Sequence, residues 1–199
     1  MPAIDRWVVL QAIELLRARP SAAGQRPLLA VNLSGTSLND QSFLDFLVQH
    51  AGDAAVADSL CFEITETVAV TNLSNAIHFM RELQARGCKF SLDDFGSGVS
   101  SFMYLKTLPV NFLKIDGQFI SQIAHDPIDR SMVEAVSKIG RALGIHTVAE
   151  CVESAAVLEE LKRIGVDFVQ GFYLARPRPL ADLAQDPSAL EARPPTATS

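Results

Sequence analysis

The sequence lacks the features that secreted and membrane-spanning proteins depend on. It has three cysteines in 199 residues, Cys61, Cys88 and Cys151. An odd and widely spaced set argues against a disulfide framework and against a cysteine-based zinc site. No apolar run approaches the roughly 18 residues of a membrane span, and the N-terminus has no signal-peptide pattern. We therefore expect reduced thiols, a cytoplasmic location and no membrane contact for this segment.

The sequence also lacks an excess of positive charge. Lys and Arg number 17 against 23 Asp and Glu, a net charge of -6. Binding to a nucleic-acid backbone depends on clustered Lys and Arg, so we expect no DNA or RNA partner. A nucleotide ligand would need metal ions or local basic groups. With 48% hydrophobic residues, a chain of this length can bury one core without disulfides.

Short apolar runs alternate with amphipathic segments along most of the chain. After a helix over residues 4–19, the pattern predicts strands at 28–34, 60–65, 89–94, 111–116, 146–150 and 167–170. Helices are predicted between them at 40–50, 72–86, 101–108, 128–143 and 154–164. Alternation of this kind is typical of parallel strands with helical crossovers, and the first strand reads as buried on both faces.

Two architectures fit this order of elements, an open doubly wound sheet and a closed (β/α) barrel. The strands carry no glycine-rich phosphate loop, which lowers the expectation of a dinucleotide-binding sheet. A closed barrel has eight strands, whereas about six are predicted here. We expect one domain over residues 1–183. The Pro- and Ala-rich residues 184–199 are predicted to form a disordered tail.

Polar side chains stand at the carboxyl end of nearly every predicted strand. They are Asn32, Glu63, Asp93, Asp94, Lys114, Asp116, Glu150 and Gln170. In a parallel barrel these ends converge on one face, where five carboxylates would repel one another without positive charge. Hard oxygen ligands suit Mg²⁺ or Mn²⁺, and two such ions are the usual device for displacement at phosphorus.

Simpler interpretations stay open for each of these residues. Asp93 and Asp94 precede a Gly-Ser-Gly turn and suit a turn or a helix cap. Lys114 suits a buried, paired lysine, and Asn32 and Gln170 suit groups that satisfy the backbone. A Schiff-base role for Lys114 would require an apolar pocket that lowers its pKa, and the nearby carboxylates would act in the opposite direction.

Six short motifs together resemble a known family. They are Val31-Asn32-Leu33-Ser34, Glu63-Ile64-Thr65-Glu66, Asp93-Asp94-Phe95-Gly96-Ser97-Gly98, Leu113-Lys114-Ile115-Asp116, Ala149-Glu150-Cys151-Val152-Glu153 and Gln170-Gly171-Phe172. Their order and spacing are similar to those of the EAL domain, over about residues 4–179. The resemblance implies a TIM-type (β/α) barrel and hydrolysis of cyclic di-GMP to pGpG with two Mg²⁺ or Mn²⁺ ions.

The resemblance also implies roles for individual residues. Asn32, Glu63, Asp93 and Asp94 correspond to metal ligands, with Asp93 bridging the two ions. Lys114 resembles the residue that holds and activates the attacking water. Glu150 is similar to an acidic partner of the second metal's water shell, and Glu66 to the glutamate that steadies the loop after Asp94. Gln170 and Asp116 are implied to hold substrate or to orient Lys114.

The sequence departs from the family in one large and two small respects. The Glu-Ala-Leu motif of an early strand, with its metal-binding glutamate and a nearby phosphate-binding arginine, is absent. Cys151 stands where glycine is usual, and Val99 where an aromatic residue is common. We expect an incomplete, truncated domain with impaired phosphodiesterase activity. The alternative is a non-catalytic module that binds cyclic di-GMP or dimerises. Expected partners are a second copy and an upstream sensor or diguanylate-cyclase-like domain.

Overall fold

The computed structural model describes residues 1–18, 27–96, 102–180 and 182. Its helices are α1 (Pro2–Ala18), α2 (Gly35–Leu38), α3 (Gln41–His50), α4 (Ala54–Ala57), α5 (Glu66–Thr71), α6 (Leu73–Gln84), the 3₁₀ turn η1 (Tyr104–Lys106), α7 (Gly117–Ile120), α8 (Pro127–Leu143) and α9 (Ala155–Ile164). The strands are β1 (Leu29–Asn32), β2 (Leu60–Thr65), β3 (Lys89–Phe95), β4 (Phe112–Ile115), β5 (His146–Ala149) and β6 (Phe168–Val169).

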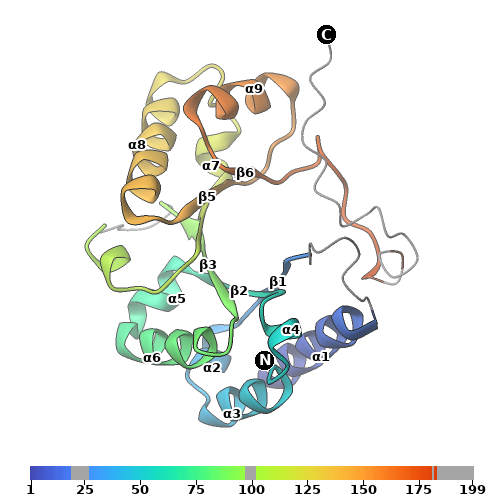
Figure 1. Ribbon diagram of the computed structural model, residues 1–199. Coiled ribbons are helices and arrows are strands. Elements are labelled where there is room, and N and C mark those ends of the chain that lie inside the picture. Colours follow the sequence, from blue (N-terminus) through green and yellow to red (C-terminus); the bar gives the residue numbers. More distant parts are fainter. Residues whose placement is uncertain (19–26, 97–101, 181, 183–199) are drawn as a thin grey trace.

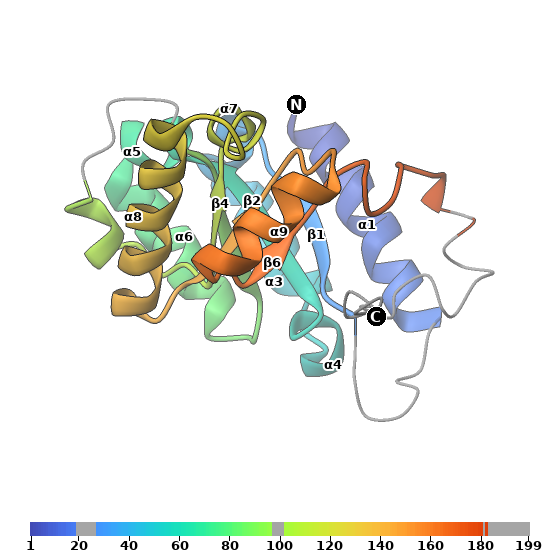
Figure 2. The same cartoon turned by 90° about the horizontal axis from the view of Figure 1, so that it is seen from above.

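The six strands form one parallel sheet whose spatial order is the order of the sequence. Helices surround the sheet, from α1 beside one end to α8 and α9 at the other (Figures 1 and 2). This is the arrangement of a (β/α) barrel with six of its eight strands. Within the described residues β1 and β6 do not pair with each other, so the barrel is open on that side. The predicted incomplete barrel is confirmed.

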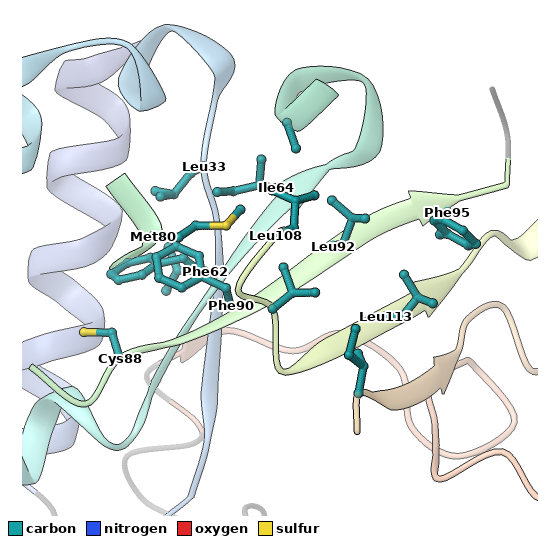
Figure 3. Close-up of a cluster of buried hydrophobic side chains, with 14 of the residues drawn as sticks. Leu33, Phe62, Ile64, Met80, Cys88, Phe90, Leu92, Phe95, Leu108 and Leu113 are labelled. Carbon is teal, nitrogen blue, oxygen red and sulfur yellow. The ribbon is translucent and has the colours of Figure 1, made fainter. Parts of the chain in front are cut away.

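The core lies between the sheet and its helices. Alternate strand residues point to this side, and Phe62, Ile64, Phe90 and Leu92 are among its fully buried members (Figure 3). Met80 of α6 packs among them. Burying an aromatic or branched side chain of this size stabilises the fold by about 1.5–3 kcal/mol. The alternation sends the intervening residues of each strand to the opposite, concave face.

Local signals set the ends of the long helices. Asp126 caps α8 by accepting hydrogen bonds from the backbone N–H groups of Ile128 and Asp129, and Pro127 occupies the first turn. Gly144 ends the helix in the left-handed conformation, with φ of 71°. These features explain why the predicted boundaries of this helix agree with the structure to within one residue at each end.

Two local predictions were wrong. The segment 101–108 was predicted as a helix, but the described part contains only the short turn η1, because Pro109 follows closely and leaves no room for a further helical turn. The first strand was predicted as buried on both faces, whereas Ala30 and Asn32 of β1 are exposed. They lie on the concave face beside the open side of the barrel. Residues 184–199 lie outside the described residues.

Candidate active site

Lys114 of β4 lies at the centre of a group of carboxylates from β2, β3 and the residue that follows β5. Its Nζ atom is 2.9 Å from Oε2 of Glu63, 3.0 Å from Oδ1 of Asp93 and 2.7 Å from Oε1 of Glu150. The lysine side chain is only 5% exposed, and those of the three acids are 11–17% exposed. The three contacts match the three N–H donors of an ammonium group. The parallel sheet therefore brings these four predicted site residues together.

The charges of this cluster stabilise the ammonium form of Lys114. Burial alone would lower the pKa of Lys114, but the hydrogen bonds and charges of Glu150, Glu63 and Asp93 outweigh burial and raise it. A Schiff-base nucleophile must be a neutral amine at working pH. The structure therefore argues against an aldolase-like role for Lys114 and agrees with a charged lysine among acids.

A second group of oxygens lies beside Lys114. Asp93, Asp94 and Glu150 each have a carboxylate oxygen that lies within 4.8 Å of those of the other two. Asp94 adopts a left-handed backbone with φ of 55°, which Asp tolerates better than most residues. Burial, followed by the negative charges of Asp93 and Asp116, raises the pKa of Asp94. Three crowded carboxylates of this type form a site suited to a divalent cation.

Asn32 and Glu63 are neighbours on the adjacent strands β1 and β2. The parallel register pairs Asn32 of β1 directly with Glu63 of β2, and Thr65 of β2 with Asp93 of β3. The Asn32 side chain is exposed on the concave face. The amide of Asn32 and the carboxylate of Glu63 therefore lie on one edge of the Lys114 cluster, as hard oxygen donors with the chemistry that was predicted for metal ligands.

Glu66 is a buried carboxylate that links the end of β3 to η1. Its Oε2 accepts a hydrogen bond from the backbone N–H of Gly96 at 3.0 Å, and its Oε1 accepts one from the hydroxyl of Tyr104. Glu66 thus joins the end of β3 to η1. The loop that it is expected to steady includes residues 97–101, which lie outside the described residues, so that role stays a prediction. Tyr104 was not predicted as a site residue, because in the sequence it looks like one apolar position among Phe102, Met103 and Leu105.

Asp116 and Gln170 occupy the predicted strand ends with different local roles. The Asp116 carboxylate accepts a hydrogen bond from the backbone N–H of Gln118 at 2.8 Å and caps α7. Lys114 and Asp116 form no ion pair within the described part of the chain, so direct orientation of Lys114 by Asp116 is not seen. Gln170 follows β6, and its exposed side chain lies at the same end of the sheet.

The three cysteines divide into two buried thiols and one exposed thiol. Burial raises the pKa of Cys61 to about 12 and that of Cys88 to about 11, so both are small protonated core residues. Cys151 is exposed and has a left-handed backbone, with φ of 53°. A β-carbon at Gly117 would lie only 2.5 Å from its Sγ. This left-handed conformation favours glycine, the residue that the resemblance to the EAL domain leads us to expect at position 151.

Comparison with known proteins identifies the family. The family model described as the EAL domain matches residues 1–177. The chain belongs to the EAL domain family. The cyclic di-GMP phosphodiesterase PdeB of Shewanella oneidensis is 37% identical to this EAL domain over 186 residues, which is 93% of the chain and 22% of that relative. MucR of Pseudomonas aeruginosa, a bifunctional diguanylate cyclase and cyclic di-GMP phosphodiesterase, is 36% identical over 90% of the chain and 26% of its own length.

Solved structures agree with this assignment. A structure of the MucR phosphodiesterase in complex with c-di-GMP matches with a TM-score of 0.82 and 36% identity, covering 91% of this chain and 74% of that one. The EAL domain of DcpA from Mycobacterium smegmatis matches with a TM-score of 0.81 and 32% identity, covering 90% and 82% of the two chains. This EAL domain therefore shares its fold with both structures. The chain spans only about a quarter of the length of PdeB and MucR.

Proposed function

We propose that this EAL domain binds cyclic di-GMP and hydrolyses one of its phosphodiester bonds. The observation that carries this proposal is the buried Lys114 among Glu63, Asp93 and Glu150, with Asp94 alongside. Acids and one cation on the carboxyl ends of parallel strands are where a barrel of this type carries its chemistry. The relatives named as cyclic di-GMP phosphodiesterases support the choice of substrate.

The donor set fits two Mg²⁺ or Mn²⁺ ions. Asp93 and Asp94 would hold one ion, with Glu150 beside it to hold its water, because one oxygen of each of the three acids converges within 4.8 Å. Asn32 and Glu63 would hold the other, with Asp93 shared between the two. When bound, such ions neutralise the phosphate and favour hydroxide over water. Bound ions would compensate the negative charge of the acids around Lys114, in addition to the compensation by the ammonium group.

The side chains of the chain position water and substrate. The Lys114 ammonium would donate hydrogen bonds to the attacking water and to a phosphate oxygen, favouring the hydroxide form by its positive charge. The water oxygen forms a bond to phosphorus while the bond between phosphorus and the departing ribose oxygen breaks. The ribose oxygen takes up a proton, and the opened ring is pGpG. Glu150 would accept a proton or hold the surrounding water, and Gln170 and Asp116 would hold substrate. Glu66 would act only indirectly, through the end of β3 to which it is bonded.

The residues absent from this sequence limit the expected rate. No Glu-Ala-Leu motif occurs in residues 1–199, so one metal ligand and one phosphate-binding arginine of the family are not among them. We propose that these residues alone hold the first ion weakly and turn over slowly. The same absence supports the second candidate function, a module that binds cyclic di-GMP without cleaving it.

Two partners are expected for this domain, a second copy of the chain and an upstream domain. We propose assembly as a homodimer and linkage to an upstream sensor or diguanylate-cyclase-like domain. The chain spans 22% and 26% of the lengths of PdeB and MucR, and the name of MucR combines the two enzyme activities, which supports the second expectation. Light scattering on the purified chain tests the first. Within the described residues, no helix combines the length and apolarity that crossing a bilayer requires.

Chromatography of reaction mixtures tests the proposed function. The purified chain is incubated with cyclic di-GMP and Mg²⁺ or Mn²⁺, and both pGpG and protein-retained cyclic di-GMP are quantified. We expect metal-dependent pGpG that disappears in Asp93→Asn and Lys114→Ala. Unchanged hydrolysis in either variant contradicts the assigned roles. Retention without cleavage supports the binding module, and the absence of both contradicts the two functions together.

A further inference from the structure

Asp5 of α1 is a buried carboxylate that the proposed function does not use. The residue is 6% exposed, and its Oδ2 atom accepts three hydrogen bonds. The backbone N–H of Ser34 donates one at 3.0 Å, and the hydroxyls of Ser34 and Ser37 donate the others at 2.6 Å. The two hydroxyl contacts have the short length of hydrogen bonds to an ionised acceptor. Asp5 therefore ties α1 to the segment that follows β1.

This segment begins directly after Asn32, the last residue of β1. The N–H of Leu33 donates to the carbonyl of Glu63 at 2.9 Å, and the N–H of Ser34 donates to Asp5. The two residues that follow Asn32 are thus held by hydrogen bonds, one to β2 and the other to α1. Because the Asn32 side chain is exposed, its position relative to Glu63 depends mainly on how this backbone is fixed.

The packing of α1 does not by itself require a charged group at position 5. Val9, Ala12 and Ile13 of the same helix are buried in the apolar core and attach it there. An apolar side chain at position 5 would pack without the cost of removing a charge from water. A carboxylate adds direction, because its donors must meet its oxygen with hydrogen-bond geometry. The contact with Ser34 therefore sets the course of the backbone after β1.

We propose that Asp5 is a positioning residue that acts through Ser34 to hold Asn32 in place as a metal ligand, an inference that rests on the proposed function. Asp5 itself would touch neither the ion nor the substrate. Replacing a group that orients a metal ligand typically lowers metal affinity by about tenfold to a hundredfold. The effect should be confined to the ion that Asn32 would hold, because Asp94, at the other ion, belongs to β3.

Binding of Mn²⁺ to the full chain tests this inference without relying on turnover. Free Mn²⁺ is measured by its electron paramagnetic resonance signal while protein is titrated in. We expect Asn32→Ala to weaken one Mn²⁺ site, and Asp5→Asn to weaken the same site by about tenfold. Ser34→Ala, which keeps the backbone donor and loses the hydroxyl, should act in the same direction. In the phosphodiesterase assay, Asp5→Asn should raise the Mn²⁺ concentration that gives the half-maximal rate.

Two comparisons separate positioning from general stability. Ile13→Val is the matched control, because it removes one buried methylene group from the same helix and should leave Mn²⁺ affinity unchanged. Urea unfolding of each variant gives its stability. In an Asn32→Ala background, Asp5→Asn should change Mn²⁺ affinity by less than about twofold, because residues that act through one another are not additive.

The outcomes distinguish this inference from the proposed function. Equal Mn²⁺ affinity of Asp5→Asn and the wild type overturns the inference alone. An equal loss of affinity in Asp5→Asn and Ile13→Val, or an undiminished effect of Asp5→Asn in the Asn32→Ala background, also overturns it. Wild-type protein that binds neither Mn²⁺ nor cyclic di-GMP overturns the proposed function itself.

Discussion

Nζ of Lys114 lies 2.7 Å from Oε1 of Glu150, so β4 contacts the residue that directly follows β5, its neighbour in the sheet. The two residues are 36 positions apart in the sequence, and the same Nζ also pairs with Glu63 and Asp93. Lys114 is therefore a structural counter-charge as well as a candidate catalytic group. Replacing Lys114 should change both stability and turnover. Its effect on stability can be measured separately by comparing the protein with and without added metal ions.

Lys114→Met should destabilise the metal-free protein. Removing one partner of a buried ion pair costs about 3–5 kcal/mol, because the remaining charges lose their compensation. Divalent cations should recover part of this loss, so Mg²⁺ or Mn²⁺ should raise the melting temperature of the variant more than that of the wild type. Differential scanning fluorimetry with and without metal measures this. Lys138→Met, at an exposed position of α8, is the control, and an equal metal response in both variants would contradict the assignment.

Tyr104→Phe should weaken the link that Glu66 makes between β3 and η1. The substitution removes the hydroxyl that donates to the buried Glu66 carboxylate and keeps the ring. Leaving a buried carboxylate oxygen without this donor costs about 1–3 kcal/mol. Urea unfolding should show that loss, and kcat for cyclic di-GMP should fall because Asp94 belongs to β3, whose end this link holds. Tyr173→Phe, on the exposed segment after β6, should change neither quantity.

Asp5 should make stability depend on acid. Its Oδ2 accepts hydrogen bonds from Ser34 N at 3.0 Å and from the hydroxyls of Ser34 and Ser37 at 2.6 Å, which joins α1 to the segment after β1. Burial opposes ionisation, but these hydrogen bonds from Ser34 and Ser37 outweigh it and lower the pKa of Asp5. The contribution is complete above the unfolded pKa, roughly 3.9, and is lost as the pH falls through the lower folded value.

Asp5→Asn should therefore be less stable than the wild type near neutral pH. The expected loss is about 1–3 kcal/mol, since hydrogen bonds to a charged group are replaced by weaker ones. The gap between the two proteins should close as the pH falls below the folded pKa of Asp5. Urea unfolding at several pH values measures this, with Glu14→Gln on the exposed side of α1 as control. A gap that is independent of pH would show that ionisation of Asp5 does not contribute.

Cys151→Gly should stabilise the domain. A left-handed backbone destabilises a residue with a β-carbon by about 1–2 kcal/mol, and glycine avoids this strain. Glycine also makes the unfolded chain more flexible, which lowers the stability of the folded state by about 0.4–1 kcal/mol. The difference predicts a net gain of roughly 0.5–1 kcal/mol in the free energy of unfolding. Cys151→Ser keeps the β-carbon and should show no gain. Equal stability of the glycine and serine variants would mean that the backbone at position 151 carries no strain.

The sequence by itself determined the elements and the chemistry available to them. Apolar alternation placed all six strands to within about two residues, because buried strands and amphipathic helices leave different periodicities. The recurrence of Asn32, Glu63, Asp93, Lys114 and Glu150 at strand ends was readable for the same reason. Parallel strands put such ends on one face whatever the details of packing. The resemblance of the motifs to the EAL domain then gave these residues their expected roles.

Only the tertiary structure decided which of these groups contact one another. The sequence does not show that Lys114 pairs with three carboxylates while Asp116 instead caps α7, since strand ends within hydrogen-bonding reach are separated by tens of residues. The partnership of Glu66 with Tyr104 also depends on how the chain crosses the end of the sheet. Contacts of a few ångströms depend on register, twist and side-chain packing, and periodicity carries no information about them.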